Sequence, residues 1–376
     1  MRPIYLDYNA TTPVDSKVGE AMLPYVTEHF GNPSSGHAYG VQTRKAIDKA
    51  RLQVADMLNC HTDEILFTSG GSEANNFALK GVARAYHDKG NHIITSAVEH
   101  PAVTKVCQFL EEQGCKITYL PVDEFGLVAP IQVEKAITPE TILITIMHAN
   151  NEVGTIEPIA EIADIAHRHN IRMHTDCAQA VGKIPVHLDE LKVDLLSIAG
   201  HKLYAPKGIG ALYIRDGVKL EKQIHGADHE MNRRAGTENV LEIVGLGQAC
   251  ALVDQDFDNH YRQMKQTRDR LEAGLKKRFP DIRLNGHPDK RLPNTCSVSF
   301  KGLKANVILS EMKNVAASAG AACHSEDIKI SSVLEAMKVP IEYAMGTIRF
   351  SVGKFTKTED IDMALEEISK TIARFE

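Results

Sequence analysis

The sequence lacks any long apolar run. No stretch approaches the ~18 consecutive apolar residues that a membrane-spanning helix requires. Residues 1–7 also lack the apolar core of a secretory signal peptide. These absences argue against a helical membrane protein and against a secreted protein. We therefore expect a cytoplasmic protein without membrane contact.

Charge of one sign is not in large excess either. The chain has 43 Lys and Arg residues against 49 Asp and Glu residues, a formal net charge of −6 that is spread without long runs. Such a chain has no basic stripe for a polyanion, so we expect no direct nucleic-acid ligand. With 376 residues, 43% of them apolar, it has the composition of a globular protein of two or three domains.

Paired cysteines are also missing. The seven cysteines are scattered, odd in number and contain no C-x-x-C pair, which argues against a disulfide framework and against a zinc knuckle. Most of them are therefore expected to be small buried hydrophobic residues, and the question is whether one is a reactive thiolate. The seven are Cys60, Cys107, Cys115, Cys177, Cys250, Cys296 and Cys323.

Short β-rich runs alternate with helical patterns from residue 64 onwards. This alternation predicts an α/β domain with a mainly parallel seven-stranded sheet that is covered on both faces. A proline-free stretch over 238–278 predicts one long helix, or two joined by a bend, and beyond it strands and helices suggest a smaller α+β domain. The strand-like runs of the large domain are 65–67, 92–95, 117–120, 142–146, 171–174, 195–198 and 211–214.

Three features in this pattern are candidates for chemistry. Gly70, Gly71 and Ser72 lie between a strand and a helix, where backbone N–H groups can bind an anion, although a plain turn with Ser72 as helix cap is an equal alternative. Asp176 follows a buried strand and needs a cationic partner, unless it is the cap of a helix. Lys202 follows another buried strand, where a desolvated amine can form a Schiff base.

Together these features match the protein groups that pyridoxal 5′-phosphate requires. The phosphate needs N–H donors, the pyridine nitrogen needs a carboxylate, and the aldehyde needs an amine. The order and spacing of the three features therefore indicate an enzyme that uses pyridoxal phosphate.

Further motifs extend this interpretation over nearly the whole chain. With residues 5–13, 30–35, 234–239 and 348–351, the sequence resembles the cysteine desulfurases of the NifS/IscS type, within the fold-type-I aminotransferase superfamily. Residues 291–296 and 321–325 are similar to selenocysteine lyases. The resemblance implies a large cofactor domain over 15–258, a small domain formed by 1–14 and 259–376, and a homodimer.

The resemblance also implies roles for individual residues. Lys202 would bind the cofactor covalently, Asp176 would pair with the ring nitrogen, Gln179 would bond the ring 3′-oxygen, and His100 would stack on the ring and transfer protons. The residues expected to hold the phosphate are Gly71, Ser72 and His201, together with Thr237 from the partner subunit.

The substrate side of the site is implied in the same way. Asn151 and Arg349 would orient the substrate carboxylate, and Cys323, among small residues on a mobile loop, would be the nucleophile. The implied reaction is that of a sulfurtransferase, which converts L-cysteine to L-alanine and leaves a persulfide on Cys323. A sulfur-acceptor or scaffold protein would take the sulfur, with iron–sulfur cluster assembly among the pathways.

Two alternatives stay open at this point. The first is a selenocysteine lyase that releases selenium from L-selenocysteine, and the second is a desulfurase that is active only with its acceptor. Two departures from the family pattern also stand out. Ala199 replaces a phosphate-binding serine of many desulfurases, and His225 and His229 replace part of a glycine-rich run. These two histidines alone are too few ligands for a metal, and none is expected.

Overall fold

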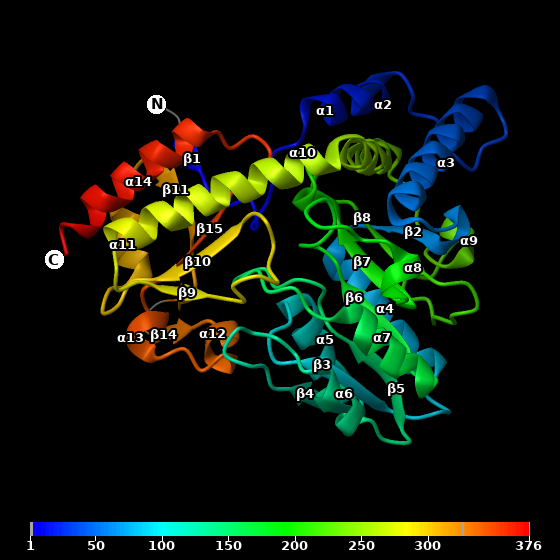
Figure 1. Cartoon of the computed structure of the whole chain (residues 1–376). Coiled ribbons are helices and arrows are strands. Elements are labelled where there is room, and N and C mark those ends of the chain that lie inside the picture. Colours follow the sequence, from blue (N-terminus) through cyan, green and yellow to red (C-terminus); the bar gives the residue numbers. More distant parts are fainter. Residues whose placement is uncertain (1–2, 325–326, 376) are drawn as a thin grey trace.

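A seven-stranded sheet forms the centre of the larger part of the molecule (Figure 1). Its strand order is β2-β8-β7-β6-β5-β3-β4, and β8 is the one member that runs against its neighbours. All seven predicted strands are present and the sheet is mainly parallel, which confirms the predicted fold class. The strands are β2 (Ile65–Thr68), β3 (His92–Ser96), β4 (Lys116–Leu120), β5 (Thr141–Thr145), β6 (Arg172–Asp176), β7 (Leu195–Ala199) and β8 (Gly210–Ile214).

This computed structural model describes residues 3–324 and 327–375, and for residues 321–324 and 327–329 it describes the backbone alone. None of the helices in these ranges is long and apolar enough to cross a membrane.

Helices cover both faces of the large sheet because successive side chains of a buried strand point to opposite sides. Ile93 and Leu195 pack with α4 and α5 in one apolar cluster, whereas their neighbours Ile94 and Leu196 pack with α3 and α7 in another. The covering helices are α3 (Ala38–Leu58), α4 (Gly71–Ala85), α5 (Pro101–Glu112), α6 (Pro130–Ala136), α7 (Ile159–Arg168) and α8 (Leu188–Leu191).

The long helix α10 (Val240–Arg278) connects the two parts of the molecule, as the sequence predicted. Its first half packs Ile243 and Leu246 into the core beside the large sheet, and its second half packs Leu271 and Leu275 into a separate core. The helical dihedral angles are interrupted at Asp256, so the predicted bend is also present.

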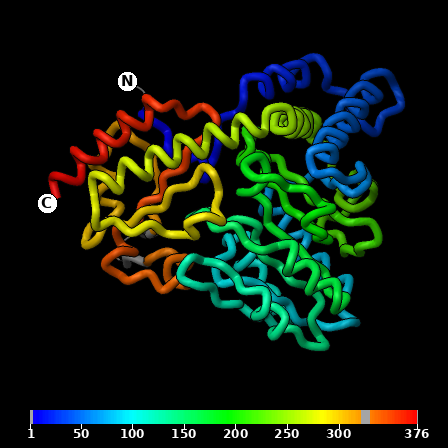
Figure 2. Tube along the Cα trace, viewed as in Figure 1, coloured from blue at the N-terminus to red at the C-terminus, as the bar shows by residue number. Residues whose placement is uncertain are grey.

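The smaller part contains an antiparallel sheet of order β12-β15-β10-β9. The N-terminal strand β1 (Ile4–Tyr5) joins this part by pairing with β11 (Val315–Ala316), and Figure 2 shows both chain ends on this side. The other elements here are β9 (Arg283–Asn285), β10 (Thr295–Ser299), α11 (Ala305–Glu311), β12 (Ser318–Ala319), β13 (Ala321–His324), β14 (Asp327–Ile330), α12 (Ser332–Ala336), α13 (Ile341–Ala344), β15 (Thr347–Ser351) and α14 (Thr358–Ile372).

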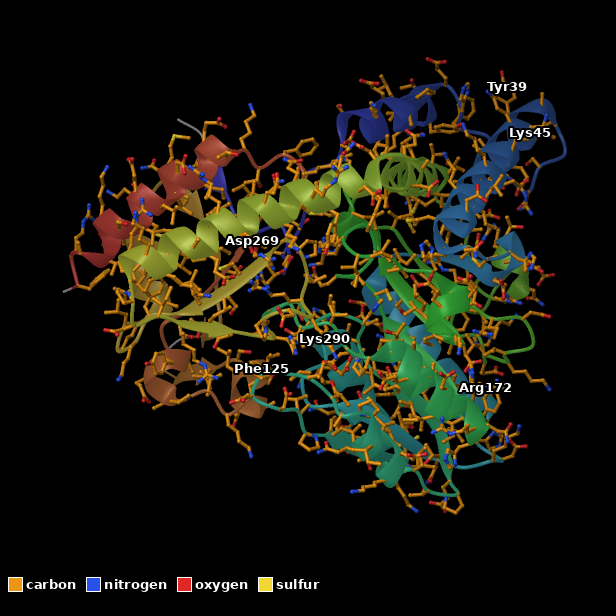
Figure 3. The ribbon with its side chains drawn as sticks, viewed as in Figure 1. Tyr39, Lys45, Phe125, Arg172, Asp269 and Lys290 are labelled. Carbon is orange, nitrogen blue, oxygen red and sulfur yellow. The ribbon has the colours of Figure 1, made fainter. Side chains whose placement is uncertain are left out.

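Short elements complete the chain. They are α1 (Ser16–Met22), α2 (Pro24–Thr27), η1 (Thr62–Glu64), η2 (Gly200–Lys202) and α9 (His229–Asn232). The two parts of the molecule meet near Phe125 and Lys290, which are labelled in Figure 3. There the Ile156 N–H donates to the Lys290 carbonyl at 2.9 Å, and the Leu292 N–H donates to the Gly154 carbonyl at 2.8 Å.

The segment that carries Cys323 differs from its prediction. The small residues there suggested a loop, but β13 and β14 pair as an antiparallel hairpin in which Cys323 is opposite Ile328. Backbone ladders need no large side chains, so a run of small residues can still form a strand. The side chain of Cys323 itself lies outside the described part of the structure.

Candidate functional site

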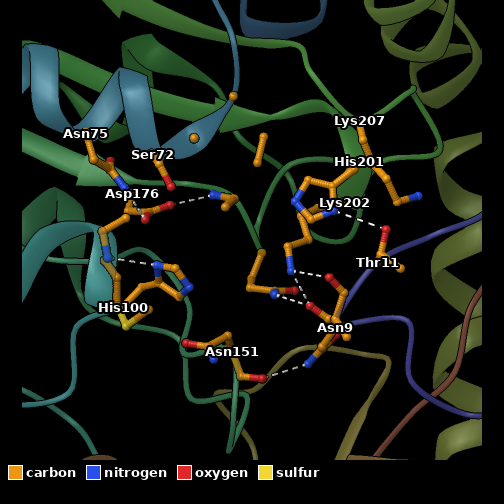
Figure 4. Close-up of a pocket in the computed structure, with 18 of the residues that line it drawn as sticks. Asn9, Thr11, Ser72, Asn75, His100, Asn151, Asp176, His201, Lys202 and Lys207 are labelled. Atoms are coloured by element: carbon orange, nitrogen blue, oxygen red, sulfur yellow. Dashed lines mark hydrogen bonds between the residues drawn. The ribbon is translucent and has the colours of Figure 1, made fainter. Parts of the chain in front are cut away.

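A cavity of about 610 Å³ lies where β6 and β7 end (Figure 4). Strand ends contribute Asp176 and Ala199, the turn after β7 contributes Lys202, and Arg349 comes from β15 of the smaller part. Because ligands of open α/β sheets bind at the carboxyl ends of the strands, this position identifies the candidate site. Most of the residues predicted from the sequence lie here: Gly71, Ser72, His100, Asn151, Asp176, Gln179, His201, Lys202 and Arg349.

The glycine-rich turn forms one end of the cavity. Gly70, with φ of +146°, turns the chain into α4, so the helix begins at Gly71. Ser72 is therefore not the predicted helix cap but lies in the first turn, where backbone N–H groups lack partners within the helix. A Cβ atom on Gly71 would lie 3.1 Å from the Ala199 Cβ, so glycine allows this turn to pack against β7. The geometry is suited to an anion.

Glu73 places a carboxylate in the same turn, which sequence reasoning did not single out. Its side chain accepts a hydrogen bond from the Ser69 N–H at 2.7 Å and pairs with Arg234 at 2.9 Å. Burial pushes the pKa of Glu73 upward, but the bonds from Arg234 and Ser69 outweigh burial and leave the pKa lowered. Arg234 thus neutralises a negative charge that would otherwise repel an anion. Arg234 is the first residue of the 234–239 motif, and this position could have indicated its role in the sequence.

Asp176 is held in place by two neutral donors of the protein. The Asn75 Nδ2 donates to one carboxylate oxygen at 2.7 Å, and the Ala178 N–H donates to the other at 2.9 Å. The alternative of a helix cap is wrong, because residues 178–183 form turns. Asn75 lies one helical turn after Gly71. This spacing could have indicated that its side chain faces the same site. Its Oδ1 is buried without a partner among the described residues.

His100 caps helix α5 beside this carboxylate. Its Nδ1 accepts a hydrogen bond from the Ala102 N–H at 3.1 Å, so the proton of the neutral imidazole is on Nε2. Burial lowers the pKa of His100, although Asp176 acts in the opposite direction. The ring is therefore largely neutral at neutral pH and has a donor available for the cavity.

Lys202 points into the cavity from the turn after β7 (Figure 4). Its Nζ donates to the carbonyl oxygens of Asn9 at 2.5 Å and Ala10 at 2.7 Å. Burial, and then the positive charge of Arg349, lowers the pKa of Lys202 to about 8. A substantial fraction of the amine is therefore neutral near physiological pH and can act as a nucleophile.

His201 lies beside Lys202 and is a neutral group. Its Nδ1 is 3.1 Å from the Thr11 Oγ1. Burial, and then the charge of Lys202, lowers the pKa of His201 to about 4. Thr11, Asn9 and Ala10 all come from the N-terminal segment, which lines the cavity although sequence reasoning gave it no role. Their position depends on the pairing of β1 with β11, which is far away in sequence.

Arg349 forms the opposite wall. Its guanidinium donates to the Asn151 carbonyl at 3.0 Å and to Asp7 at 2.8 Å, while its Nε is buried without a partner among the described residues. Asn151 also accepts a bond from the Asn9 Nδ2 at 3.1 Å. The arginine is thus rigidly held, and its fork is suited to a substrate carboxylate. Asp7 was not predicted, since a single acidic residue near the N-terminus carries no signal.

One predicted residue is not brought into the cavity of the single chain: Thr237 is exposed and is not among the lining residues. The side chain of Cys323 lies outside the described part of the structure. The six described cysteines are free thiols. Burial raises the pKa of Cys107 and of Cys296 to about 12, so these two thiols are unreactive at neutral pH.

The two histidines that depart from the family pattern form no metal site in the described residues. The His229 Nδ1 accepts a bond from the Gly236 N–H at 3.2 Å, which holds the turn before Thr237. Within residues 3–324 and 327–375, no group of three His, Cys, Asp or Glu side chains is arranged to hold a metal ion.

The chain is similar to known proteins over nearly its whole length. Residues 4–364 match the family model described as aminotransferase class-V. The chain is 50% identical to a protein named cysteine desulfurase IscS from Dictyoglomus turgidum, over 99% of this chain and 95% of that protein.

Solved structures agree with this. A NifS-like protein superposes with a TM-score of 0.93 at 35% identity, covering 99% of this chain and 100% of that one. A structure entitled SspA in complex with cysteine superposes with a TM-score of 0.82 at 37% identity, covering 94% and 99% of the two chains.

Proposed function

The chain belongs to the aminotransferase class-V family, and we propose that it is a pyridoxal-phosphate-dependent cysteine desulfurase that converts L-cysteine to L-alanine. The observation that carries this proposal is the placement of a partly neutral Lys202 amine in one cavity with an anion cradle, a strand-end carboxylate and an arginine fork. Relatives that bear the cysteine desulfurase name, at 44–50% identity over nearly the whole chain, support the same activity.

The donor set of the cavity fits the cofactor. The N–H groups at the start of α4 suit its phosphate, with Gly71, Ser72 and His201 around it. The carboxylate of Asp176 suits a protonated ring nitrogen, and the Lys202 amine suits the aldehyde. When bound, the cofactor supplies an electron sink that makes the substrate Cα–H acidic and the Cβ–S bond labile.

The protein's own residues then hold the substrate and move its protons. Arg349 binds the carboxylate through its fork, and Asn151 flanks it. The Lys202 amine, with a pKa of about 8, would accept or return a proton at Cα, and the His100 Nε2–H is a second proton donor in the same cavity.

We assign sulfur transfer to Cys323. Its thiolate electron pair forms the new S–S bond with the substrate sulfur, and the electrons of the broken C–S bond stay with carbon, which is protonated to give alanine. The residues that follow the hairpin of Cys323 are held against the large part of the molecule. Val333 and Leu334 pack against Val98 and Val153, and the Ser331 hydroxyl donates to the Glu152 carboxylate.

We propose a homodimer and an acceptor protein as the partners. Thr237 is exposed in the single chain, and the apolar side chains of Leu23 and Phe30, also in the large part, are 68% and 72% exposed, which is typical of surface that is covered in an assembly. The persulfide sulfur would leave to an acceptor, for which iron–sulfur cluster assembly is the first pathway to test. A cytoplasmic location is supported by the free thiols of all six described cysteines.

A substrate panel tests this function. Wild type should form alanine from L-cysteine, and mass spectrometry should find one extra sulfur on Cys323. The Cys323→Ser variant should keep the absorption band of the bound cofactor and lose the persulfide. Alanine formation from selenocysteine but not from cysteine would instead identify a selenocysteine lyase. Unchanged sulfur transfer by Cys323→Ser would refute the assignment of Cys323.

A further inference from the structure

A second lysine, Lys183, is buried behind the cavity and takes no part in the mechanism above. It is 5% exposed, and its Nζ donates to the Gln179 Oε1 at 2.5 Å. The charged groups that act on it are Lys202 and Arg349, both positive. Burial, followed by these two charges, lowers the pKa of Lys183 well below its ordinary value. The charged form of the Lys183 amine is therefore disfavoured, and its hydrogen bond to Gln179 is the contact through which it can act.

A buried lysine with no acidic partner is costly, because desolvation of the amine is repaid only by hydrogen bonds. Among the described residues, the one acceptor found for the Lys183 amine is the Gln179 side chain. A methionine at this position would avoid the cost while filling a similar volume. The presence of a lysine at this position is therefore explained by its hydrogen bond to the Gln179 side chain.

The Gln179 amide is constrained at both ends. Its Oε1 accepts from Lys183, and its Nε2 donates to the Asn9 carbonyl at 2.9 Å. An amide has two N–H donors, so one N–H remains for the cavity that Gln179 lines. If the amide rotated by 180°, the cavity would be offered an acceptor instead, and Oε1 would face the Asn9 carbonyl.

We propose that Lys183 is a positioning residue that locks the Gln179 amide with an N–H donor directed at the ring oxygen of the cofactor. This inference rests on the proposed function, since it requires pyridoxal phosphate in the cavity. Lys183 touches neither cofactor nor substrate and acts through Gln179 alone. The donor it presents favours the ionised ring oxygen over the protonated one.

Lys183→Met tests the proposal, because it keeps the length and removes the donor. Titration of the apo-protein with pyridoxal phosphate should show an about tenfold weaker Kd, the loss expected for one hydrogen bond at a buried site. The pH midpoint of the bound cofactor's absorption band should shift upward, since the ring oxygen loses its donor. The melting temperature should be unchanged or higher, because a buried amine has been removed.

Matched variants make the result specific. Lys192→Met, which removes an exposed lysine paired with Asp164, should leave Kd, absorption midpoint and melting temperature as in wild type. Lys183→Gln keeps an N–H donor and should retain Kd within about threefold of wild type. Gln179→Leu should weaken binding as Lys183→Met does, and the double variant should be no weaker than Gln179→Leu alone.

Two results would overturn the proposal. One is a wild-type Kd and absorption midpoint in Lys183→Met, even with lowered stability. The other is additive weakening in the double variant. If Lys183→Met does not fold, an equal loss of cofactor affinity in Lys183→Gln and Gln179→Leu would also reject it. Failure of the proposed function has a separate signature: the wild-type apo-protein would then bind no pyridoxal phosphate at all.

Discussion

The two walls of the cavity are built in different ways. The wall proposed for the cofactor comes from segments that follow strands of one sheet, with Asp176 ending β6 and Lys202 following β7. The wall proposed for the substrate brings together Asp7, Asn151 and Arg349, which are separated by up to 342 residues. The first wall is set by local strand–turn geometry, whereas the second exists only when both parts of the chain are packed.

This difference has an energetic side. The groups of the cofactor wall are buried at the carboxyl ends of the strands, and this burial lowers the pKa of Lys202 and of His201. Substrate-wall groups are instead paired with one another: Arg349 forms an ion pair with Asp7 within the smaller part and donates to the Asn151 carbonyl of the larger part. Changes to the first wall should therefore affect cofactor binding and chemistry, and changes to the second should affect substrate affinity.

The largest effect is expected for Lys202→Ala in the cofactor wall. Loss of the amine removes both the nucleophile and the proton carrier, so alanine formation should fall by at least about 1,000-fold. Alanine production from L-cysteine measures this. Lys192→Ala, at an exposed lysine, is the control and should keep full activity. Activity within tenfold of wild type in Lys202→Ala would remove this lysine from the mechanism.

Arg349→Lys should damage the substrate wall alone. Lysine keeps the charge but loses the fork, so KM for L-cysteine should rise by about 100-fold while the cofactor band is unchanged. The control is Arg374→Lys at an exposed ion pair with Glu311, which should keep the wild-type KM. An equal loss of cofactor affinity in Arg349→Lys would contradict the separation of the two walls.

Arg234→Gln should weaken cofactor binding although Arg234 does not itself line the cavity. Glu73 would lose its counter-charge beside the anion cradle, and Kd for pyridoxal phosphate should rise by about tenfold. The neighbouring Arg233→Gln is the matched control, because the Arg233 guanidinium donates to the Asp63 carbonyl at the surface and not to Glu73. Fluorescence titration of both apo-proteins measures the effect, and equal Kd values would reject it.

The pH dependence of cofactor uptake should report on Lys202. Its pKa is lowered to about 8, so the reactive neutral amine increases as the pH rises through that value. The rate of reconstitution of apo-protein should increase about tenfold from pH 7 to pH 9, with a midpoint near 8. Stopped-flow absorbance measures the rate. A midpoint near the ordinary lysine pKa would show that burial does not act on this amine.

The smallest effect is expected for Ala199→Ser. A hydroxyl beside Gly71 would add one donor to the anion cradle, and Kd for pyridoxal phosphate should improve by about fivefold or less. Equilibrium titration against wild type measures this change. Weaker binding would mean that the extra atom displaces Gly71, whose position against Ala199 is already close.

Prediction from sequence succeeded where signals are local. The seven strands, the bend in the long helix and the positions of Gly71, Asp176 and Lys202 at or just after strand ends follow from apolar periodicity and turn residues. It failed where a partner comes from elsewhere. Asn75, which donates to Asp176, was not predicted, because the helix after Gly70 brings it there from 101 residues away in sequence.

The sequence by itself determined where the strands lie along the chain and the chemical identity of the groups at their ends, because both depend on neighbours within a few residues. Only the tertiary structure decided which remote groups complete the site. Asp7, Asn9 and Arg349 meet because β1 pairs with β11 and because the two cores share one long helix. The tertiary structure also decided the lowered pKa of the Lys183 and Lys202 amines, because their burial arises from packing that no local sequence pattern predicts.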